Sequence, residues 1–354
     1  MIATGLVGYG TAGEFFHAPL IAAADGLRLA AVVTRDPERA ARAARDHPDA
    51  RVVPSADDLL GLGLDLIVIA SPNRTHVPLA RAALSAGLPV VVDKPLAATA
   101  AEALELADLA RERGVMLTVF QNRRWDGDFL TLRTLDLGEV HRFESRFERW
   151  RPVPKGGWRE NGGPEELGGL LYDLGSHLVD QALRYLGPAT DVYAETDVRR
   201  AGVGADDDAF VALTHASGAR SHLWMSSVAA RLGPRLRVLG SRAAYVKWGL
   251  DPQEERLRAG ERPGGPGWGT EPADRWGVLG TDAESRRVET VPGAYQEFYA
   301  GVVACLRDGA PPPVDPAEVA GALAVLHAAR TSAAERRVVA LDPSAGLIQA
   351  SRGA

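Results

Sequence analysis

Short apolar runs alternate with longer amphipathic runs along the first third of the chain. The runs at residues 27–33 and 64–70 are almost continuously hydrophobic, which is typical of strands buried on both faces of a parallel sheet. The amphipathic run that follows residues 27–33 has Asp36 in the N-cap position and Pro37 in the first helical position. Strands that alternate with helices at this spacing predict a parallel, doubly wound sheet. The remaining elements expected here are strands at 6–7, 90–92 and 115–120 and helices after Gly13 and at 37–45, 75–86 and 100–113.

The hydrophobic pattern changes after about residue 121. A helix, long strands and a second helix are expected up to residue 187, and period-2 stretches at 191–248 predict a meander of antiparallel strands. The Pro- and Gly-rich stretch at 262–269 is long for a plain connection, so we expect it to cover part of the molecule. Two closing helices are expected near 294–307 and 316–335.

The bulk composition fits two folded domains. The chain has 354 residues, of which 46% are hydrophobic and 24% charged, and this balance is typical of globular proteins. Together with the change of pattern, it predicts an α/β + α+β protein. The change of pattern places one domain at residues 1–121 and a second at residues 122–354.

Charge and cysteine usage narrow the choice of partners. The net charge is −6, and no basic stripe interrupted by aromatics occurs, so nucleic acid and anionic membranes are not expected partners. No apolar run approaches the roughly 20 residues that cross a bilayer, and the first residues lead straight into a strand, which predicts a cytoplasmic protein. A single cysteine, Cys305, excludes an internal disulfide, and no His, Cys and carboxylate cluster has metal-ligand spacing, so no metal is expected.

A glycine-rich turn follows the first strand and opens a helix. The turn has the spacing G-x-G-x-x-G, in which glycines allow a tight turn, close approach of a pyrophosphate, and helix–strand packing. The free N–H groups at the helix start would then face the phosphates. A glycine turn can also join a strand to a helix without a ligand, but the context here favours a dinucleotide. The predicted cofactor contacts in the turn are Gly8, Gly10, Thr11, Ala12 and Gly13.

The end of the second strand indicates which nicotinamide cofactor binds. Sites that prefer NAD usually carry an acidic residue there, which accepts a hydrogen bond from the ribose 2′-hydroxyl. This chain has Thr34 and Arg35 instead, and a guanidinium can pair with a 2′-phosphate. Asp36 is better explained as a helix cap. We therefore expect NADP(H) to be preferred, with NAD(H) as the alternative.

Two further patches supply candidate catalytic groups. Lys94 follows the fifth strand at the edge of the sheet where ligands bind, and Asp173 and His177 are four residues apart, on one helical face. A histidine can take the proton of an alcohol, a carboxylate beside it can fix its orientation, and a lysine can donate to the reacting oxygen. Taken singly, a lysine after a strand is more often solvated, and an Asp/His pair is more often an ordinary helical contact.

Together, the glycine turn, Asp93-Lys94-Pro95 and the Gly-Gly…Asp-x-x-x-His segment ending at His177 resemble the glucose–fructose oxidoreductase/inositol dehydrogenase/MocA family. The resemblance covers nearly the whole chain. It implies that residues 1–121 form a Rossmann domain that binds NADP(H), and that residues 122–354 form an α+β domain for substrate binding and oligomerisation, with an open, mostly antiparallel sheet. It also implies that Lys94, Asp173 and His177 are catalytic. The chain departs from the family at Asp93, where glutamate is usual, so we expect altered cofactor contact there.

The segments 16–20, 121–129 and 245–254 resemble the NADP-linked scyllo-inositol dehydrogenases of that family. The resemblance implies further contacts, which we give as expectations. The additional cofactor contacts would be Ser71, Asn73, His76, Asp93, Gln121, Trp158 and Arg159. The substrate contacts would be Arg124, Trp125 and Tyr172, although the first two could equally form a salt bridge and a core aromatic.

The leading hypothesis is an NADP(H)-dependent oxidoreductase that acts on a secondary alcohol of a polyol, cyclitol or sugar. Within the same family, a sugar ketoreductase or an aldose dehydrogenase could use the same residues. A non-catalytic NADP-sensing regulator is the alternative from a different class, and such regulators typically lose part of the Lys/Asp/His set that is complete here. The resemblance also implies a homodimer or homotetramer formed through the open sheet.

Overall fold

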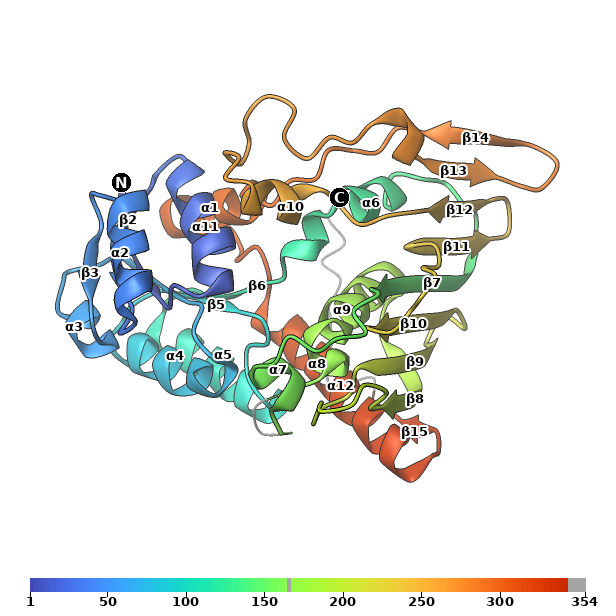
Figure 1. The fold of residues 1–354 in the computed structure, drawn as a ribbon, viewed down its shortest axis with the longest axis horizontal. Coiled ribbons are helices and arrows are strands. Elements are labelled where there is room, and N and C mark those ends of the chain that lie inside the picture. Colours follow the sequence, from blue (N-terminus) through green and yellow to red (C-terminus); the bar gives the residue numbers. More distant parts are fainter. Residues whose placement is uncertain (164–166, 343–354) are drawn as a thin grey trace.

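The computed structural model describes residues 1–163 and 167–342, and within them the chain forms two large sheets (Figure 1). The first sheet is parallel, with six strands in the order β3-β2-β1-β4-β5-β6. Its strands are β1 (Ile2–Val7), β2 (Leu27–Val33), β3 (Arg51–Val53), β4 (Leu66–Ile69), β5 (Val90–Asp93) and β6 (Leu117–Phe120). The order reverses between β1 and β4, so ligands are expected at the carboxyl ends of these strands.

The helices of the first domain alternate with its strands, as the hydrophobic pattern predicts. They are η1 (Gly13–His17), α1 (Ala18–Ala23), α2 (Pro37–Asp46), α3 (Ala56–Leu60), η2 (Asn73–Thr75), α4 (His76–Ser85) and α5 (Ala100–Arg113). Asp36 caps α2 by accepting from the backbone N–H groups of Glu38 and Arg39, so the predicted cap is confirmed. The helix after the glycine turn differs from expectation, because its first turn, η1, is π-helical.

The second sheet has nine strands in the order β14-β13-β12-β11-β7-β10-β9-β8-β15. Neighbouring strands are antiparallel except β10 and β7, which are parallel, so the predicted mostly antiparallel sheet is confirmed. The meander predicted at 191–248 is interrupted, because β7 lies between β10 and β11. The strands are β7 (Val140–Glu148), β8 (Ala189–Asp197), β9 (Asp208–His215), β10 (Arg220–Ser226), β11 (Leu236–Gly240), β12 (Ala244–Lys247), β13 (Gly277–Gly280), β14 (Ser285–Val288) and β15 (Val339–Ala340).

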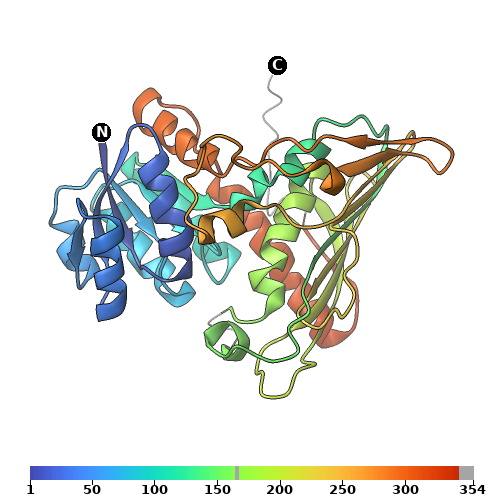
Figure 2. The same cartoon turned by 45° about the horizontal axis from the view of Figure 1, so that its top comes forward.

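Helices lie on only one face of this sheet in the described residues (Figure 2). The helices of the second part are η3 (Asn122–Trp125), α6 (Gly127–Leu132), α7 (Trp158–Asn161), α8 (Leu170–Asp173), α9 (Gly175–Leu186), α10 (Gln253–Arg258), η5 (Ala273–Arg275), α11 (Gln296–Asp308) and α12 (Pro316–Glu335). The residues of β9 alternate strictly between half-buried and buried, which is the pattern of a sheet with one covered face. Where long strands were expected before residue 187, the described residues form one strand, β7.

The last helices return to the first domain. The Thr118 hydroxyl in β6 donates to the Val314 carbonyl oxygen at 2.8 Å, and the His17 Nδ1 atom lies 2.6 Å from the Tyr299 hydroxyl in α11. The two sheets are therefore fixed against each other by residues far apart in the sequence. The domain boundary at residue 121 stays a prediction. None of the helices in the described ranges is both long enough and apolar enough to cross a membrane.

Candidate active site

The glycine turn has the geometry of a dinucleotide cradle. Gly8 has a φ of +101°, and a Cβ atom added to Gly13 would lie 2.0 Å from the Gly8 carbonyl oxygen, so the turn itself needs both glycines. Gly10 is different, because a Cβ atom there would meet nothing closer than the Arg39 side chain at 3.7 Å. Space beside Gly10 is open, as close approach of a pyrophosphate to the backbone requires. The turn therefore fits a bound dinucleotide.

A cavity of about 190 Å³ lies over this turn. Ser71 and Asn73, which follow β4, and Asp93 at the end of β5 line it from the first domain. Tyr172 and Asp173 line it from the second domain. The cavity thus brings together the following predicted cofactor residues: Gly8, Gly10, Thr11, Ala12, Ser71, Asn73 and Asp93.

Two of the expected cofactor contacts lie behind the cavity walls. His76 is buried, with Nδ1 2.7 Å from the Pro95 carbonyl oxygen and Nε2 2.9 Å from the Ser71 carbonyl oxygen. Its ring therefore braces the wall instead of lining the cavity. Gln121 is also buried and lines neither this cavity nor a second cavity, of about 600 Å³, that lies beside it. The direct contact expected of His76 is corrected, because both of its ring nitrogens face main-chain carbonyl oxygens. The contact expected of Gln121 stays a prediction.

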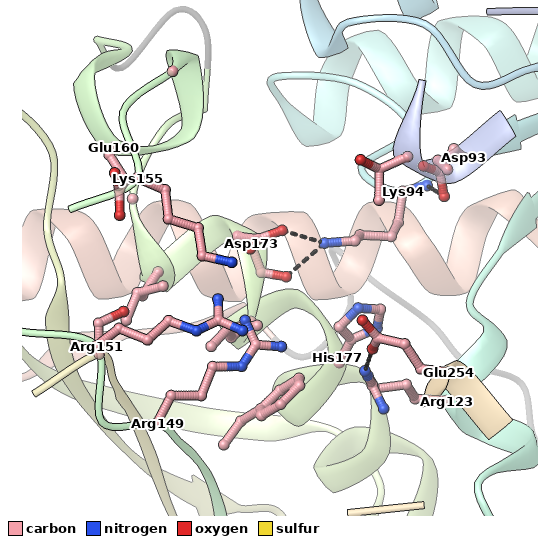
Figure 3. A pocket seen from close by; sticks show the side chains of 18 of the residues that line it. Asp93, Lys94, Arg123, Arg149, Arg151, Lys155, Glu160, Asp173, His177 and Glu254 are labelled. Atoms are coloured by element: carbon pink, nitrogen blue, oxygen red, sulfur yellow. Dashed lines mark hydrogen bonds and ion pairs between the residues drawn. The ribbon is translucent and has the colours of Figure 1, made fainter. Parts of the chain in front are cut away.

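The Lys94 side chain is held at the junction of the two domains (Figure 3). Its Nζ atom donates to the main-chain carbonyl oxygen of Asp173 at 2.6 Å and to the Asp173 Oδ1 atom at 2.8 Å. Both residues line the small cavity and also a larger one of about 600 Å³. The ion pair therefore lies where the two cavities meet.

Asp173 is positioned by a second carboxylate that the sequence reasoning missed. Asp206 accepts hydrogen bonds from the Leu170 N–H through its carbonyl oxygen and from the Leu171 N–H through its carboxylate, and this fixes the start of α8. A Cβ atom on Gly169 would lie 1.9 Å from the Asp206 Oδ1 atom, so only glycine fits there. Burial raises the pKa of Asp206 to about 6. The run of three aspartates at 206–208 was the available signal for this residue.

His177 lies in the first turn of α9 and lines the larger cavity. Burial lowers its pKa well below 6.5, and the nearby charges of Lys94 and Arg123 lower it further, so the imidazole is neutral at pH 7. Its Nδ1 atom is buried and makes no hydrogen bond within the described residues. The expectation that Asp173 orients His177 is therefore corrected. The chain breaks its helix at Leu174, and the Asp173 carboxylate is drawn to Lys94.

The expected substrate contacts at 124 and 125 are also corrected. Arg124 is buried and donates to both carboxylate oxygens of Asp180 and to Glu318. Trp125 packs its ring against Phe298 at 5.7 Å between centroids. Neither residue lines the larger cavity. Arg124 therefore forms a salt bridge and Trp125 is an aromatic packed against the core, which are the alternatives considered from the sequence.

The residue before this pair, Arg123, reaches the larger cavity instead. It donates to Asp126 at 3.2 Å and to Glu254 at 2.9 Å, and its guanidinium lies 4.6 Å from the centre of the Phe147 ring. The short helix η3 rotates successive side chains by a large angle, so an error of one residue moves a side chain from the cavity to the core. Tyr172 lines the small cavity over the glycine turn and not the larger one, so its expected substrate contact stays a prediction.

Thr34 and Arg35 follow β2, whose last carbonyl oxygen accepts from the Gly8 N–H at 3.0 Å, so they lie next to the glycine turn. Neither lines the small cavity, and the Arg35 Nε atom donates to the Pro54 carbonyl oxygen at 3.3 Å. Arg39, one turn into α2, does line it. Sequence reasoning missed Arg39 because it considered only the strand end. The side chains of Trp158 and Arg159 lie outside what the structure describes, so their expected contacts stay predictions.

Family models match both parts of the chain. The model of the oxidoreductase family's NAD-binding Rossmann fold matches residues 2–121, and the model of its C-terminal alpha/beta domain matches residues 132–341. The two matched ranges contain the six-stranded and the nine-stranded sheet respectively.

The relatives of the chain include oxidoreductases similar over nearly its full length. An uncharacterized oxidoreductase of Escherichia coli, YdgJ, is 42% identical over 96% of this chain and 99% of its own. The scyllo-inositol 2-dehydrogenase (NADP(+)) IolW of Bacillus subtilis is 33% identical over 96% of both chains. A solved structure of the Bacillus subtilis oxidoreductase yvaA superposes with a TM-score of 0.90 at 32% identity, covering 96% of this chain and 98% of that one.

Proposed function

Because the chain belongs to the Gfo/Idh/MocA family of oxidoreductases, as a member with an NAD-binding Rossmann domain, we propose that it is an NADP(H)-dependent dehydrogenase or reductase of a cyclitol or sugar. It would interconvert a secondary alcohol and the corresponding ketone. The observation that carries the proposal is the Lys94–Asp173 ion pair at the junction of the two cavities, beside a neutral His177. The name of the relative IolW, scyllo-inositol 2-dehydrogenase (NADP(+)), supports the proposed substrate class and cofactor.

In this proposal the catalytic groups divide the work as follows. The nicotinamide, when bound, accepts or supplies the hydride. His177 is neutral at pH 7 and would take the hydroxyl proton of an alcohol as general base. The Lys94 ammonium would donate a hydrogen bond to the same oxygen as charge develops on it. Asp173 would hold that ammonium in place through the hydrogen bonds at 2.6 and 2.8 Å, so it is a positioning residue.

The residues of the glycine turn fit the pyrophosphate of the cofactor, and two arginines next to them fit a 2′-phosphate. Arg35 follows β2, and the Arg39 guanidinium would lie 3.7 Å from a Cβ atom added to Gly10. The carboxylate in this segment, Asp36, is engaged as the cap of α2 and lies 3.6 Å from Arg39. Guanidinium groups bind phosphate through paired hydrogen bonds, so this arrangement supports a preference for NADP(H) over NAD(H).

A spectrophotometric assay tests the function directly. NADP⁺ reduction is followed by the absorbance of reduced nicotinamide with a panel of inositols, aldoses and other polyols, and NADPH oxidation with the corresponding ketones. Wild-type protein is compared with Lys94→Met, and NADPH binding is measured separately by fluorescence. Turnover that depends on Lys94 supports the proposal. Tight NADPH binding without turnover in either direction contradicts it and favours a cofactor-sensing regulator.

We also propose that a second copy of the chain covers the open face of the nine-stranded sheet, giving a homodimer or homotetramer. The half-buried ring stack of Phe210, His222 and Trp224 lies on strands β9 and β10, with centroid distances of 5.2 to 6.0 Å. Trp248, at the end of β12, is more than half exposed. Exposed aromatic side chains in this density are typical of subunit interfaces. Light scattering on the purified protein tests this, and a monomer at all concentrations contradicts it.

A further inference from the structure

Seven cationic side chains line the larger cavity, and they divide into two groups. Four of them are paired with carboxylates: Lys94 with Asp173, Arg123 with Asp126 and Glu254, Arg200 with Asp207 and Glu160, and Arg258 with Glu254. The other three, Arg149, Arg151 and Lys155, form no ion pair with a carboxylate of the described residues. We call these three the cationic wall.

The carboxylates that line the same cavity are already engaged. Glu254 is shared by Arg123 and Arg258, and Glu160 by Arg200 and the Gly156 N–H. Asp173 holds Lys94, Asp93 accepts from the Lys94 backbone N–H, and Asp206 accepts from α8. The cationic wall therefore carries positive charge that the cavity itself does not neutralise.

The backbone holds two members of the wall in a fixed direction. The Arg149 N–H donates to the Ser226 carbonyl oxygen and the Arg151 N–H to that of Ser227, both at 2.8 Å. Both side chains line the larger cavity, and both also line a third cavity of about 830 Å³ beside it. Trp150 lines neither and is 56% exposed. The Arg200 guanidinium also donates to the Arg151 carbonyl oxygen at 3.1 Å.

Arg149 shows what this arrangement costs without an anion. Burial, together with the neighbouring Arg151 guanidinium, lowers the pKa of Arg149 to about 10. Its guanidinium packs 4.7 Å from the centre of the Phe147 ring, which gives only partial compensation. The Glu254 and Asp173 carboxylates act in the opposite direction but do not restore the ordinary pKa, so this half-buried cation is only partly compensated. An anion arriving from solvent would relieve that cost. Arg149 is close enough to His177 to lower the pKa of the imidazole, so the wall lies near the reacting groups.

The anion does not belong to the cofactor phosphates. The glycine turn lies in the small cavity, and none of the three wall residues lines that cavity. The two cavities share Thr11, Ala12, Asp93, Lys94 and Asp173, so a molecule in the larger cavity would reach Lys94 with one end. In Figure 3 the heads of Arg149, Arg151 and Lys155 point into the same pocket as Asp173 and Lys94. The other end of a molecule in the larger cavity would meet the cationic wall.

We propose that the substrate is an anionic sugar or cyclitol whose phosphate or carboxylate group is bound by Arg149, Arg151 and Lys155 while its secondary alcohol or ketone lies against Lys94 and His177. This inference rests on the proposed function, because it concerns the substrate of the same reaction. It separates this chain from an enzyme of uncharged inositols. Forked guanidinium donors match the planar geometry of a carboxylate and the tetrahedral oxygens of a phosphate.

Binding of inorganic phosphate to the NADPH-loaded protein tests the wall without requiring turnover. Isothermal titration calorimetry compares wild type with Arg149→Met and with a matched control, Arg142→Met, which removes an arginine from β7 outside both cavities. We expect Arg149→Met to weaken phosphate binding about 10- to 100-fold, the range for a hydrogen bond to a charged group, and Arg142→Met to leave it unchanged. Equal affinity in all three proteins, or displacement of NADPH by phosphate, overturns the inference.

Turnover then identifies the anion. Matched sets of a neutral hexose, its 6-phosphate and its uronic acid, and of an inositol and its monophosphate, are assayed with NADP(H). The inference predicts a lower KM for the anionic members, and Arg149→Met raises that KM 10- to 100-fold with a small change in kcat. The phosphate and uronate arms distinguish the two anions. A lower KM for the neutral members, unaffected by Arg149→Met, overturns it. If no compound is turned over but phosphate binding still depends on Arg149, the proposed function fails and the anion site stands.

Discussion

The two walls of the larger cavity carry their charges in different ways. On the wall of the first domain, Lys94 is held by two hydrogen bonds to Asp173 and its backbone N–H is bound by Asp93. On the wall formed by the segment after β7, the backbone N–H groups of Arg149 and Arg151 are hydrogen-bonded, and neither guanidinium forms an ion pair with a carboxylate of the described residues. The first arrangement holds a group for chemistry, and the second leaves charge available for a ligand. Under the proposed function, one wall would determine the rate and the other would determine which substrate binds.

The largest effect is expected where the first wall is broken. Lys94→Met removes the donor to the reacting oxygen, so we expect kcat to fall about 10²- to 10⁴-fold, the range for positioned acid–base and electrostatic groups. NADPH affinity should change little, because the glycine turn is untouched. Steady-state kinetics and fluorescence titration measure the two quantities. A loss of NADPH binding with unchanged kcat would assign Lys94 to the cofactor.

The next effect concerns stability and tests the corrected role of Arg124. Arg124→Met leaves the buried carboxylate of Asp180 and its neighbour Glu318 without their shared cation, which costs about 3–5 kcal/mol in comparable buried pairs. Urea unfolding measures the free energy of unfolding. The matched control is Arg184→Met, since Arg184 pairs with the same Glu318 but is more than one-third exposed, and its loss should cost at most about 1 kcal/mol. An unchanged stability and a raised substrate KM for Arg124→Met would restore the substrate role.

A smaller effect is expected at the cofactor end of the first wall. Arg39→Ala and Arg35→Ala should each raise the KM for NADPH by about 10-fold and leave that for NADH nearly unchanged, because only NADPH has a 2′-phosphate. Arg28→Ala, which removes an exposed arginine from β2, the strand that precedes Arg35, is the control. Equal losses for both cofactors would show that neither arginine reads the 2′-phosphate.

The smallest effect is a displaced pH profile. The pKa of His177 is lowered well below 6.5 by burial and by Lys94 and Arg123, so the imidazole stays neutral as the pH falls through 6.5. Alcohol oxidation needs the neutral base, so kcat should stay constant there and decline only at lower pH, while ketone reduction should rise as the imidazole gains a proton. His222→Gln, outside both cavities, should leave the profile unchanged. Half of the oxidation rate lost at pH 6.5 or above would contradict the role of His177.

The first wall could be predicted from the sequence, because its signals are local. The glycine turn, the Asp36 cap and the lysine after β5 depend on neighbours in the chain, and the structure has each of them as expected. The helix at Ala100–Arg113 was predicted to the residue for the same reason, since Thr99 and Glu102 form a capping box and Gly114 ends it.

The second wall could not be predicted in the same way, because its roles depend on partners distant in sequence. Arg123 and Arg124 are adjacent, and only the positions of Glu254 and Asp180 decide which one reaches the cavity. Arg149 is singled out because it forms no ion pair with a carboxylate of the described residues, and no local pattern in the sequence reports that. The partner of Asp173 was also assigned incorrectly, because the helical spacing to His177 ignored Lys94, which comes from another domain.

A comparison of kcat and KM in Lys94→Met and Arg149→Met with the preferred sugar tests the division of roles between the two walls most directly. The account predicts that Lys94→Met loses kcat with a nearly constant KM, and that Arg149→Met raises KM for an anionic sugar with a nearly constant kcat. If both variants lose the same kinetic constant by similar factors, the two walls do not have separate roles, and the account is contradicted.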